Sequence, residues 1–187
     1  AWQYLDNIPG VGGLNGQLIV NDQHARLELH SEHNQLDLDH HFENTFYYDS
    51  LTAGVDVFVS DNGWRATISE LKISSPEIDL SSSFSLKKLL DQPLEMALVA
   101  NVTEGNATNA GWYFPLQVMD KELVDYLNMA IIDGTIRQAK VVINGPLAEF
   151  PFGNNNGVFS VDAELVSSTF QFSPDWPTIT DFNANLN

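Results

Sequence analysis

The stretch that decides the fold reads Ser50-Leu-Thr-Ala-Gly-Val-Asp-Val-Phe-Val-Ser60 and continues into Asp61-Asn62-Gly63. Apolar side chains occupy every second position of it: Leu51, Ala53, Val55, Val57 and Val59. Because successive side chains of a strand point to opposite faces, this pattern predicts a β-strand with one apolar face. Asp-Asn-Gly is a strong signal for a tight hairpin turn, so we expect the return strand to follow at once.

The same strand–turn–strand pattern extends on both sides of this hairpin. Before it, residues 14–29 alternate around a turn at residues 21–23. After it, the alternation changes parity at Ser69-Glu70, where we expect a β-bulge. Further strand-like segments cover residues 78–84, 94–102, 135–144, 159–165 and 182–186. Short turns favour antiparallel neighbours, so the chain is predicted to be an all-β protein built on a meandering antiparallel sheet.

One segment, residues 119–132, has the spacing of an amphipathic helix. Its apolar residues form a single stripe: Leu123, Tyr126, Leu127, Ala130 and Ile131. Gly134 follows where a glycine commonly ends a helix. Residues 103–110, which precede the helix, are polar and are expected to form a loop. We predict that the helix packs on the sheet; a helix that lines or gates an opening is the alternative.

The composition limits the function. The chain has 25 acidic and 8 basic residues, and its net charge of −17 argues against a nucleic-acid partner, since phosphates need a basic surface. It has no cysteine, which excludes disulfides, thiol catalysis and cysteine-bound zinc. The chain begins at Ala1 and ends inside an alternating pattern, so we interpret residues 1–187 as a single segment cut from a longer chain.

Polar motifs give little support to an enzyme or a metal site. Asp37, Asp39 and His41 would share one face of a strand and would suit a metal ion, but a solvated outer face explains the same residues. The run Ser81-Ser82-Ser83 lacks a nucleophile elbow and a partnered base. We therefore predict no catalytic residue, no metal and no cofactor.

The long apolar face raises the main structural question. A wide sheet with such a face must close into a barrel, stack as a sandwich, or curl into a trough that an apolar ligand fills. The alternation by itself favours an ordinary core, because apolar strand faces usually pack against one another.

A family resemblance is carried by several short motifs in a fixed order. They are Pro-Gly-Val-Gly-Gly-Leu-Asn-Gly at Pro9 to Gly16, Gly63-Trp64, Tyr113-Phe-Pro115, Gly145-Pro-Leu-Ala-Glu-Phe-Pro-Phe-Gly153 and Trp176-Pro177. With these motifs the chain resembles, over nearly its whole length, the periplasmic AsmA-like region of the YhdP family of bacterial envelope proteins.

The resemblance implies a fold and a role. The fold would be a long, twisted antiparallel sheet curled into a U-shaped groove, with one amphipathic helix. The role would be non-enzymatic phospholipid transport between membranes, in support of outer-membrane lipid homeostasis and the permeability barrier. The segment would lie in the periplasm, with an inner-membrane anchor elsewhere in the full-length protein. Its partners would be phospholipid acyl chains, both membranes through parts absent from this segment, and neighbouring segments that pair with its edge strands.

The resemblance also implies which residues face lipid. These would be the apolar strand positions Leu18, Val20, Leu27, Leu29, Val55, Val57, Val59, Trp64, Ile68, Phe159 and Val161. The alternative from a different class is an interaction module, a β-sandwich with a sealed core that binds a protein or glycan on its acidic outer face. A hydrolase has the least support, since no acid/base pair stands out.

Overall fold

The computed structural model describes residues 10–11, 13, 15–37, 44–113 and 121–186. They form one ten-stranded sheet in which all pairings are antiparallel. The strands are β1 (Gly10–Val11), β2 (Asn15–Val20), β3 (His24–Asp37), β4 (Phe46–Ser60), β5 (Gly63–Ser74), β6 (Ile78–Leu89), β7 (Glu95–Asn106), β8 (Ile131–Pro146), β9 (Val158–Phe170) and β10 (Ile179–Leu186). The predicted all-β class is therefore confirmed.

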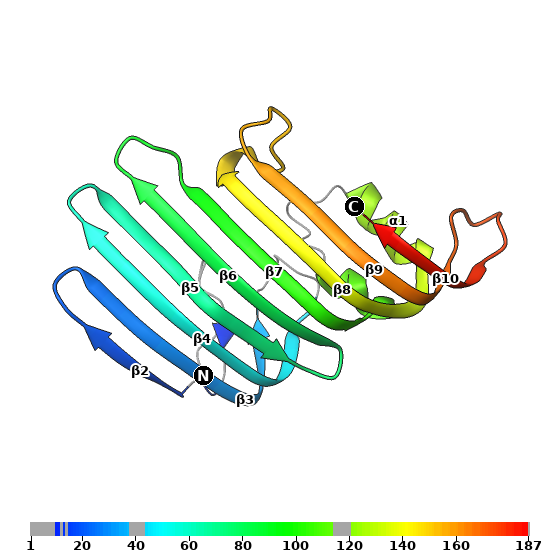
Figure 1. The fold of residues 1–187 in the computed structure, drawn as a ribbon, viewed down its shortest axis with the longest axis horizontal. Helices are drawn as coiled ribbons and strands as arrows, with labels where there is room; N and C mark the ends of the chain where they lie inside the picture. Colours follow the sequence, from blue (N-terminus) through cyan, green and yellow to red (C-terminus); the bar gives the residue numbers. More distant parts are fainter. Residues whose placement is uncertain (1–9, 12, 14, 38–43, 114–120, 187) are drawn as a thin grey trace.

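The sheet is a meander. From β3 to β10 each strand pairs with the next one in the sequence, and β1 and β2 both pair with β3. Figure 1 shows β2 and β10 at opposite edges of the sheet, which is open rather than closed on itself. Because the described residues form one sheet and not two, the β-sandwich alternative is wrong for this part of the chain.

The two ends of the strands differ. The connections at residues 21–23, 61–62, 90–94 and 147–157 lie together at one end, which we call the hairpin end (Figure 1). The turn at residues 61–62 is the predicted hairpin, and Gly63 after it has a φ of 135°, which favours glycine. The other end, which we call the helix end, carries the helices between β7 and β8.

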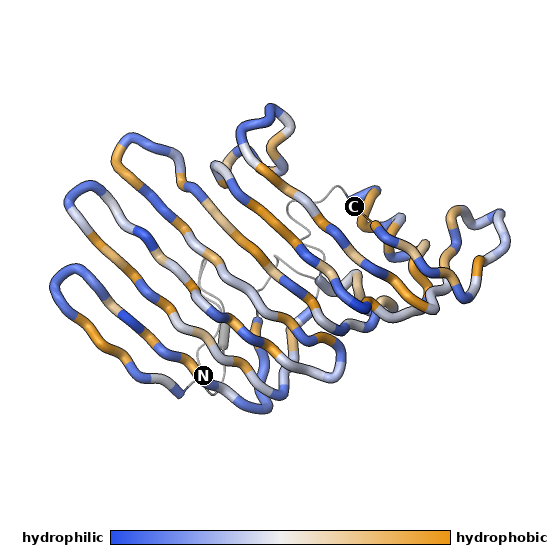
Figure 2. The backbone as a smooth tube through the Cα atoms, viewed as in Figure 1, coloured by the Kyte–Doolittle hydropathy of each residue, from blue (hydrophilic) through white to orange (hydrophobic). Residues whose placement is uncertain are grey.

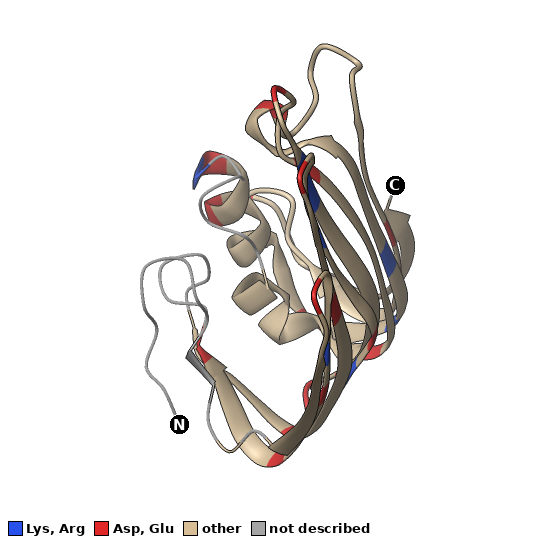
Figure 3. Ribbon diagram, turned by 90° about the vertical axis from the view of Figure 1, so that its left-hand side faces the viewer, with Lys and Arg blue, Asp and Glu red and all other residues tan. Residues whose placement is uncertain are grey.

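Within the described ranges, three helical segments accompany the sheet. The 3-10 helix η2 (Ala107–Tyr113) and the α-helix α1 (Lys121–Ala130) lie between β7 and β8, and η3 (Leu147–Glu149) lies between β8 and β9. Figure 3 shows the sheet edge-on as one curved layer, with η2 and α1 on its concave side. The predicted curled sheet with one α-helix is therefore confirmed, and α1 contacts β8 and η2.

The predicted apolar stripe of the helix is only partly correct. Val124 and Ala130 are the buried residues of α1, whereas Leu123 is 47% exposed and Tyr126 is 38% exposed. Ile131 is not in the helix, because β8 begins there. The apolar arc of this helix is wider than one stripe, because it also includes Val124, which is buried.

Two expectations about the helix boundaries were wrong. Gly134 does not end α1: it lies inside β8 at a shift of register with β9, with a φ of 139°. A Cβ atom there would lie 2.8 Å from the Cα of Ser168, so close packing of two strands explains this glycine. Residues 103–110 are not a loop, since β7 continues to Asn106 and η2 begins at Ala107.

The predicted bulge at Ser69-Glu70 is confirmed. The register between β5 and β6 shifts between Ile68 and Leu71, and Glu70 has a φ of 54°. Ile68 is opposite Phe84 and Leu71 is opposite Ser82, two residues away on β6. The extra residue therefore keeps Ile68 and Leu71 on the same face of the sheet.

Few large apolar side chains are buried in the described part of the chain. The buried ones are Tyr48, Leu51, Ala53, Ala107, Val124, Ala130, Phe152 and Leu165. Apart from Phe152, in the connection between β8 and β9, they belong to the helices or to strand segments toward the helix end. The protein therefore covers its apolar face mainly at that end, and the expectation of an ordinary sealed core fails for the rest of the sheet.

Candidate functional site

An unbroken row of apolar side chains crosses the sheet from β2 to β9. Each member is directly opposite the next on the neighbouring strand, so all of them point to the same face. We call it the central row: Leu18, Leu27, Val55, Ile68, Phe84, Leu98, Ile143 and Phe159. Figure 2 shows the alternation of apolar and polar residues along the strands that produces it.

Parallel rows flank the central row on the same face. Toward the hairpin end lies the upper row: Val20, Ala25, Val57, Ala66, Leu86 and Met96. Beyond it is the rim row, in which Trp64 lies between Val59 and Lys88 on the neighbouring strands. Toward the helix end, Leu29 is opposite Ala53, and Val141 lies between Ala100 and Val161. We refer to these rows together as the apolar face.

The register brings all the predicted lipid-facing residues onto this one face. Leu18, Leu27, Val55, Ile68 and Phe159 belong to the central row itself. The others lie in the flanking rows at two-residue spacing from them: Val20, Leu29, Val57, Val59, Trp64 and Val161. Strand alternation groups them within each strand, and the antiparallel register places these groups on one face; Trp64 and Ile68 of β5 both precede the bulge.

Much of the apolar face is open. Leu18 is 62% exposed and Phe159 41% exposed at the two ends of the central row, and the residues between them are half-buried. In contrast, Leu51 and Leu165, further toward the helix end, are 6% and 4% exposed. The open part of the apolar face thus extends from the rim row to the central row. The sealed part lies further toward the helix end.

The opposite face of the sheet is polar. One row across β3 to β6 consists of Arg26, Asp56, Thr67 and Ser85. Asp56 forms a 2.7 Å hydrogen bond with His24 Nε2 and accepts a 2.8 Å hydrogen bond from Arg26 Nη1. The bond with His24 and the charge of Arg26 hold the pKa of Asp56 below its ordinary value. This cluster thus pairs the Asp56 carboxylate with two neighbouring basic side chains on the water-facing side.

Contacts at the helix end fasten η2 over the sheet. Phe46 of β4 stacks on Tyr113 of η2, with ring centroids 5.3 Å apart. Glu77, in the connection between β5 and β6, accepts hydrogen bonds from Asn109 at 2.6 Å and from Asn106 at 3.2 Å. Burial, and secondly the charge of Glu77, raise the pKa of Tyr113.

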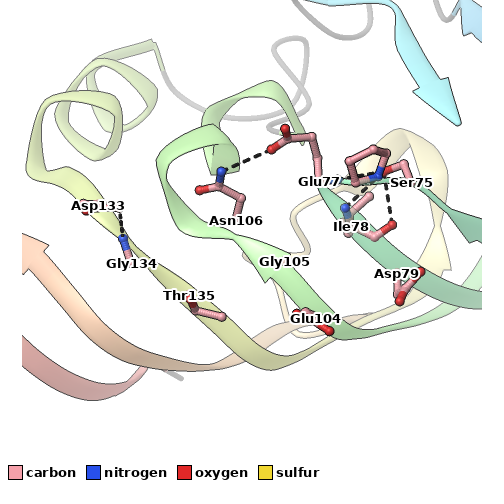
Figure 4. A pocket seen from close by; sticks show the side chains of 11 residues that line it. Ser75, Glu77, Ile78, Asp79, Glu104, Gly105, Asn106, Asp133, Gly134 and Thr135 are labelled. Atoms are coloured by element: carbon pink, nitrogen blue, oxygen red, sulfur yellow. Dashed lines mark hydrogen bonds between the residues drawn. The ribbon is translucent and has the colours of Figure 1, made fainter.

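A polar hollow lies beside these contacts. Figure 4 shows it, and its lining includes Glu77, Asp79, Glu104, Asn106 and Asp133. In the described ranges, no three His, Cys, Asp or Glu side chains are grouped so that they could hold a metal ion. Asp39 and His41, which the metal hypothesis requires, lie outside those ranges.

The comparison with known proteins agrees with this architecture. The family model described as YhdP protein matches residues 1–187. The chain belongs to the YhdP family. One curated relative of this YhdP-family chain is the intermembrane phospholipid transporter YhdP of Escherichia coli (strain K12), which is 25% identical to it over 187 residues. The match covers 100% of the chain and 15% of that transporter, and no solved structure matches the chain.

The YhdP-family chain has no membrane-spanning candidate among its described helices, all of which are too short or too polar for that. Sequence reasoning missed part of its apolar face, namely the contributions of β6, β7 and β8 to the central row. These are Phe84, Leu98 and Ile143. The alternation in β6 and β7 was visible in the sequence, but β8 has apolar residues on both faces, so its facing depends on its pairing with β7.

Proposed function

We propose that this chain is one segment, residues 1–187, of a non-enzymatic phospholipid transporter of the bacterial cell envelope. In this role the apolar face shields acyl chains from water while lipid moves through the periplasm. The longer protein would be anchored in the inner membrane and would support outer-membrane lipid homeostasis and the permeability barrier. Membership of the YhdP family and the similarity to the intermembrane phospholipid transporter YhdP of Escherichia coli support this proposal.

The observation that carries the proposal is the open central row. A row from β2 to β9 is about 34 Å long at about 4.8 Å per strand. The acyl layer of one bilayer leaflet is about 15 Å thick, half of the roughly 30 Å hydrocarbon core. The row is therefore about twice as long as one acyl chain. Its side chains are Leu, Val, Ile and Phe without an interruption by charge.

The physical basis of transport would be the removal of a solvation barrier. Each CH₂ group of an acyl chain costs about 0.8 kcal/mol when it is exposed to water. A face of many similar aliphatic side chains lowers the cost of exposing the acyl chain to water by a similar amount at every point along the face. Such a face has no deep hydrocarbon pocket that would trap the acyl chain at one position. The rows run across the strands, so a lipid would slide from strand to strand while its tails stay on apolar surface.

Photo-crosslinking in cells tests the proposal. A photoreactive phenylalanine analogue replaces Phe84, in the middle of the central row, and in a matched control it replaces Ser83, the exposed neighbour on the opposite face. We expect lipid adducts by mass spectrometry from position 84 and few from position 83. Equal yields from both positions, or adducts only with protein, would overturn the proposal.

A further inference from the structure

Lys88 is distinguished by its place on the apolar face. It lies directly opposite Trp64 at the end of β6, two residues beyond Leu86 of the upper row. The rim, upper and central rows contain no other charged residue in the described strands. The Lys88 ammonium donates a hydrogen bond to the carbonyl oxygen of Gln92, which holds it at the hairpin end.

Trp64 and Lys88 are the two residue types that typically lie at the boundary between the hydrocarbon and the headgroups of a membrane. Trp64 is 37% exposed and Lys88 is exposed, and apolar side chains lie below both of them. In bilayers, Trp rings lie at the boundary between hydrocarbon and headgroups, and Lys side chains reach past that boundary to water and phosphate. A cation at the edge of an apolar surface is therefore placed to meet the phosphate of a lipid whose tails lie on that surface.

The hairpin tips around Lys88 add charges of the opposite sign. The backbone N–H of Leu90 donates a 2.9 Å hydrogen bond to the carbonyl oxygen of Asn62, so the tips of the β4–β5 and β6–β7 hairpins lie side by side. Asp61 and Asp91 are the exposed acidic residues next to these two positions. This rim thus has a cation on the apolar face and two exposed carboxylates in the adjoining turns.

The strand residues next to these two hairpin tips carry further charges, which lie on the other face of the sheet. Lys87 forms a 3.0 Å ion pair with Glu95, and exposed Arg65 lies opposite Lys87. Together with Lys88, Asp61 and Asp91, they give the tips of the β4–β5 and β6–β7 hairpins three basic and three acidic residues, in a chain whose net charge is −17. Such a balance suits a headgroup that carries both signs better than a headgroup with net negative charge, which the rest of the chain repels.

The geometry points to a headgroup site at this rim for a zwitterionic glycerophospholipid. Its phosphate would bind Lys88, with Trp64 beside it, and its amine would bind Asp61 and Asp91. The inference rests on the proposed function and adds the lipid class and the orientation. Lys88 and Phe84 are four residues apart on β6, which corresponds to about 13 Å along the strand. One acyl layer of a bilayer has a similar thickness, about 15 Å. A lipid held at the rim would therefore place its tails on the central row.

The test uses the purified full-length protein with the photoreactive residue at position 84. It is incubated with vesicles of phosphatidylethanolamine, phosphatidylglycerol and diacylglycerol in equal amounts, and the adducts are counted by lipid class. The variants are Lys88→Gln and the double variant Asp61→Asn with Asp91→Asn. Lys140→Gln is the matched control, since it removes the same charge from an exposed position on the polar face.

We expect phosphatidylethanolamine to dominate the adducts of the unmodified protein. Lys88→Gln should lower both phospholipids relative to diacylglycerol about fivefold, the effect of one Lys at a lipid surface. The aspartate double variant should reduce the preference for phosphatidylethanolamine over phosphatidylglycerol. Adducts whose class ratios are the same for Lys88→Gln and Lys140→Gln would overturn the headgroup site alone. No lipid adduct in any protein would overturn the proposed function and this site with it.

Discussion

Phe46 and Tyr113 stack with their ring centroids 5.3 Å apart, although one belongs to β4 and the other to η2. In the sheet, β5 and β6 separate β4 from β7, the strand that leads into η2. The contact therefore spans the concave side and ties the curled helix end together. The sealed part of the apolar face, which includes Leu51 and Leu165, lies toward this end, and the open part lies toward the hairpins.

The Phe46–Tyr113 contact should make a measurable contribution to stability. In a double-mutant cycle with Phe46→Leu and Tyr113→Leu, we expect a coupling energy of about 0.5 to 1.5 kcal/mol, typical of aromatic pairs. Urea unfolding of the four proteins measures it. A coupling near zero would mean that the two rings are neighbours without energetic consequence.

Tyr113 should also make the protein sensitive to alkali. Its folded pKa is raised, so the folded state keeps the phenolic proton at a pH where the unfolded chain has lost it. This stabilisation is complete below the unfolded pKa of about 10 and is lost as pH rises through the higher folded value. Thermal unfolding should therefore show a decline in stability above about pH 10 that Tyr113→Phe lacks. A decline of the same size in both proteins would exclude Tyr113 as its source.

A charge on the apolar face should distinguish its open part from its sealed part. Leu18→Asp places a carboxylate at a position that is 62% exposed, so we expect a change in unfolding free energy of about 0.5 kcal/mol or less. Leu51→Asp places it at a position that is 6% exposed, where an unpaired charge costs about 3 to 5 kcal/mol. Urea unfolding measures both.

The control for this comparison is Ile19→Asp. Ile19 is the neighbour of Leu18 on the opposite face and is 59% exposed. It should match Leu18→Asp in stability but differ in lipid binding, because only Leu18 is in the central row. A large loss of stability from Leu18→Asp would mean that the face is sealed at that strand.

The Asp56 cluster should determine part of the stability in acid. The folded pKa of Asp56 is lowered by its hydrogen bond with His24 and by Arg26, so its contribution is present above the unfolded pKa and is lost as pH falls through the folded value. Asp56→Asn should therefore be less stable than the parent at neutral pH, and the difference should disappear in strong acid. Thermal unfolding from pH 7 down to about pH 2 checks this, since the unfolded pKa is about 3.9. A difference that stays constant with pH would contradict it.

Gly134 should tolerate no side chain. Its φ of 139° is unfavourable for other residues, and an added Cβ atom would lie 2.8 Å from Ser168 Cα. Gly134→Ala should cost about 2 kcal/mol or more, mainly from backbone strain. The matched control is Gly153→Ala, which meets nothing within 4 Å and should be nearly neutral in the same unfolding experiment.

Sequence patterning was sufficient for the parts of the fold that depend on period alone. The face of β4, the turn at residues 61–62 and the bulge at Ser69-Glu70 all follow from which positions are apolar and where turn residues interrupt them. The common facing of Leu18 and Phe159 follows from the same rule once the pairing is known. Alternation fixes side-chain direction within a strand, and pairing transfers it to the next.

The errors arose where long-range contact decides. In the sequence, Gly134 resembles a glycine that ends a helix. In the structure, its lack of a side chain allows the backbone of Ser168, on the neighbouring strand, to lie close to it. Leu123 and Val124 are apolar neighbours in α1, but only Val124 is buried once α1 packs against η2 and β8, and the spacing within the helix does not show which of the two it will be. The special position of Lys88 was also missed, because its facing depends on its register with Trp64.

The meander gives this architecture an adjustable length. Every strand after β3 is laid beside the one synthesised just before it, so each completed hairpin offers a template edge to the next. Inserting or deleting one hairpin would change the span by about 10 Å, two strand spacings, and would leave the inward and outward directions of all other side chains unchanged. Gene-level duplication of single hairpins is thus a simple route by which the width of such a sheet can change without disturbing its two faces.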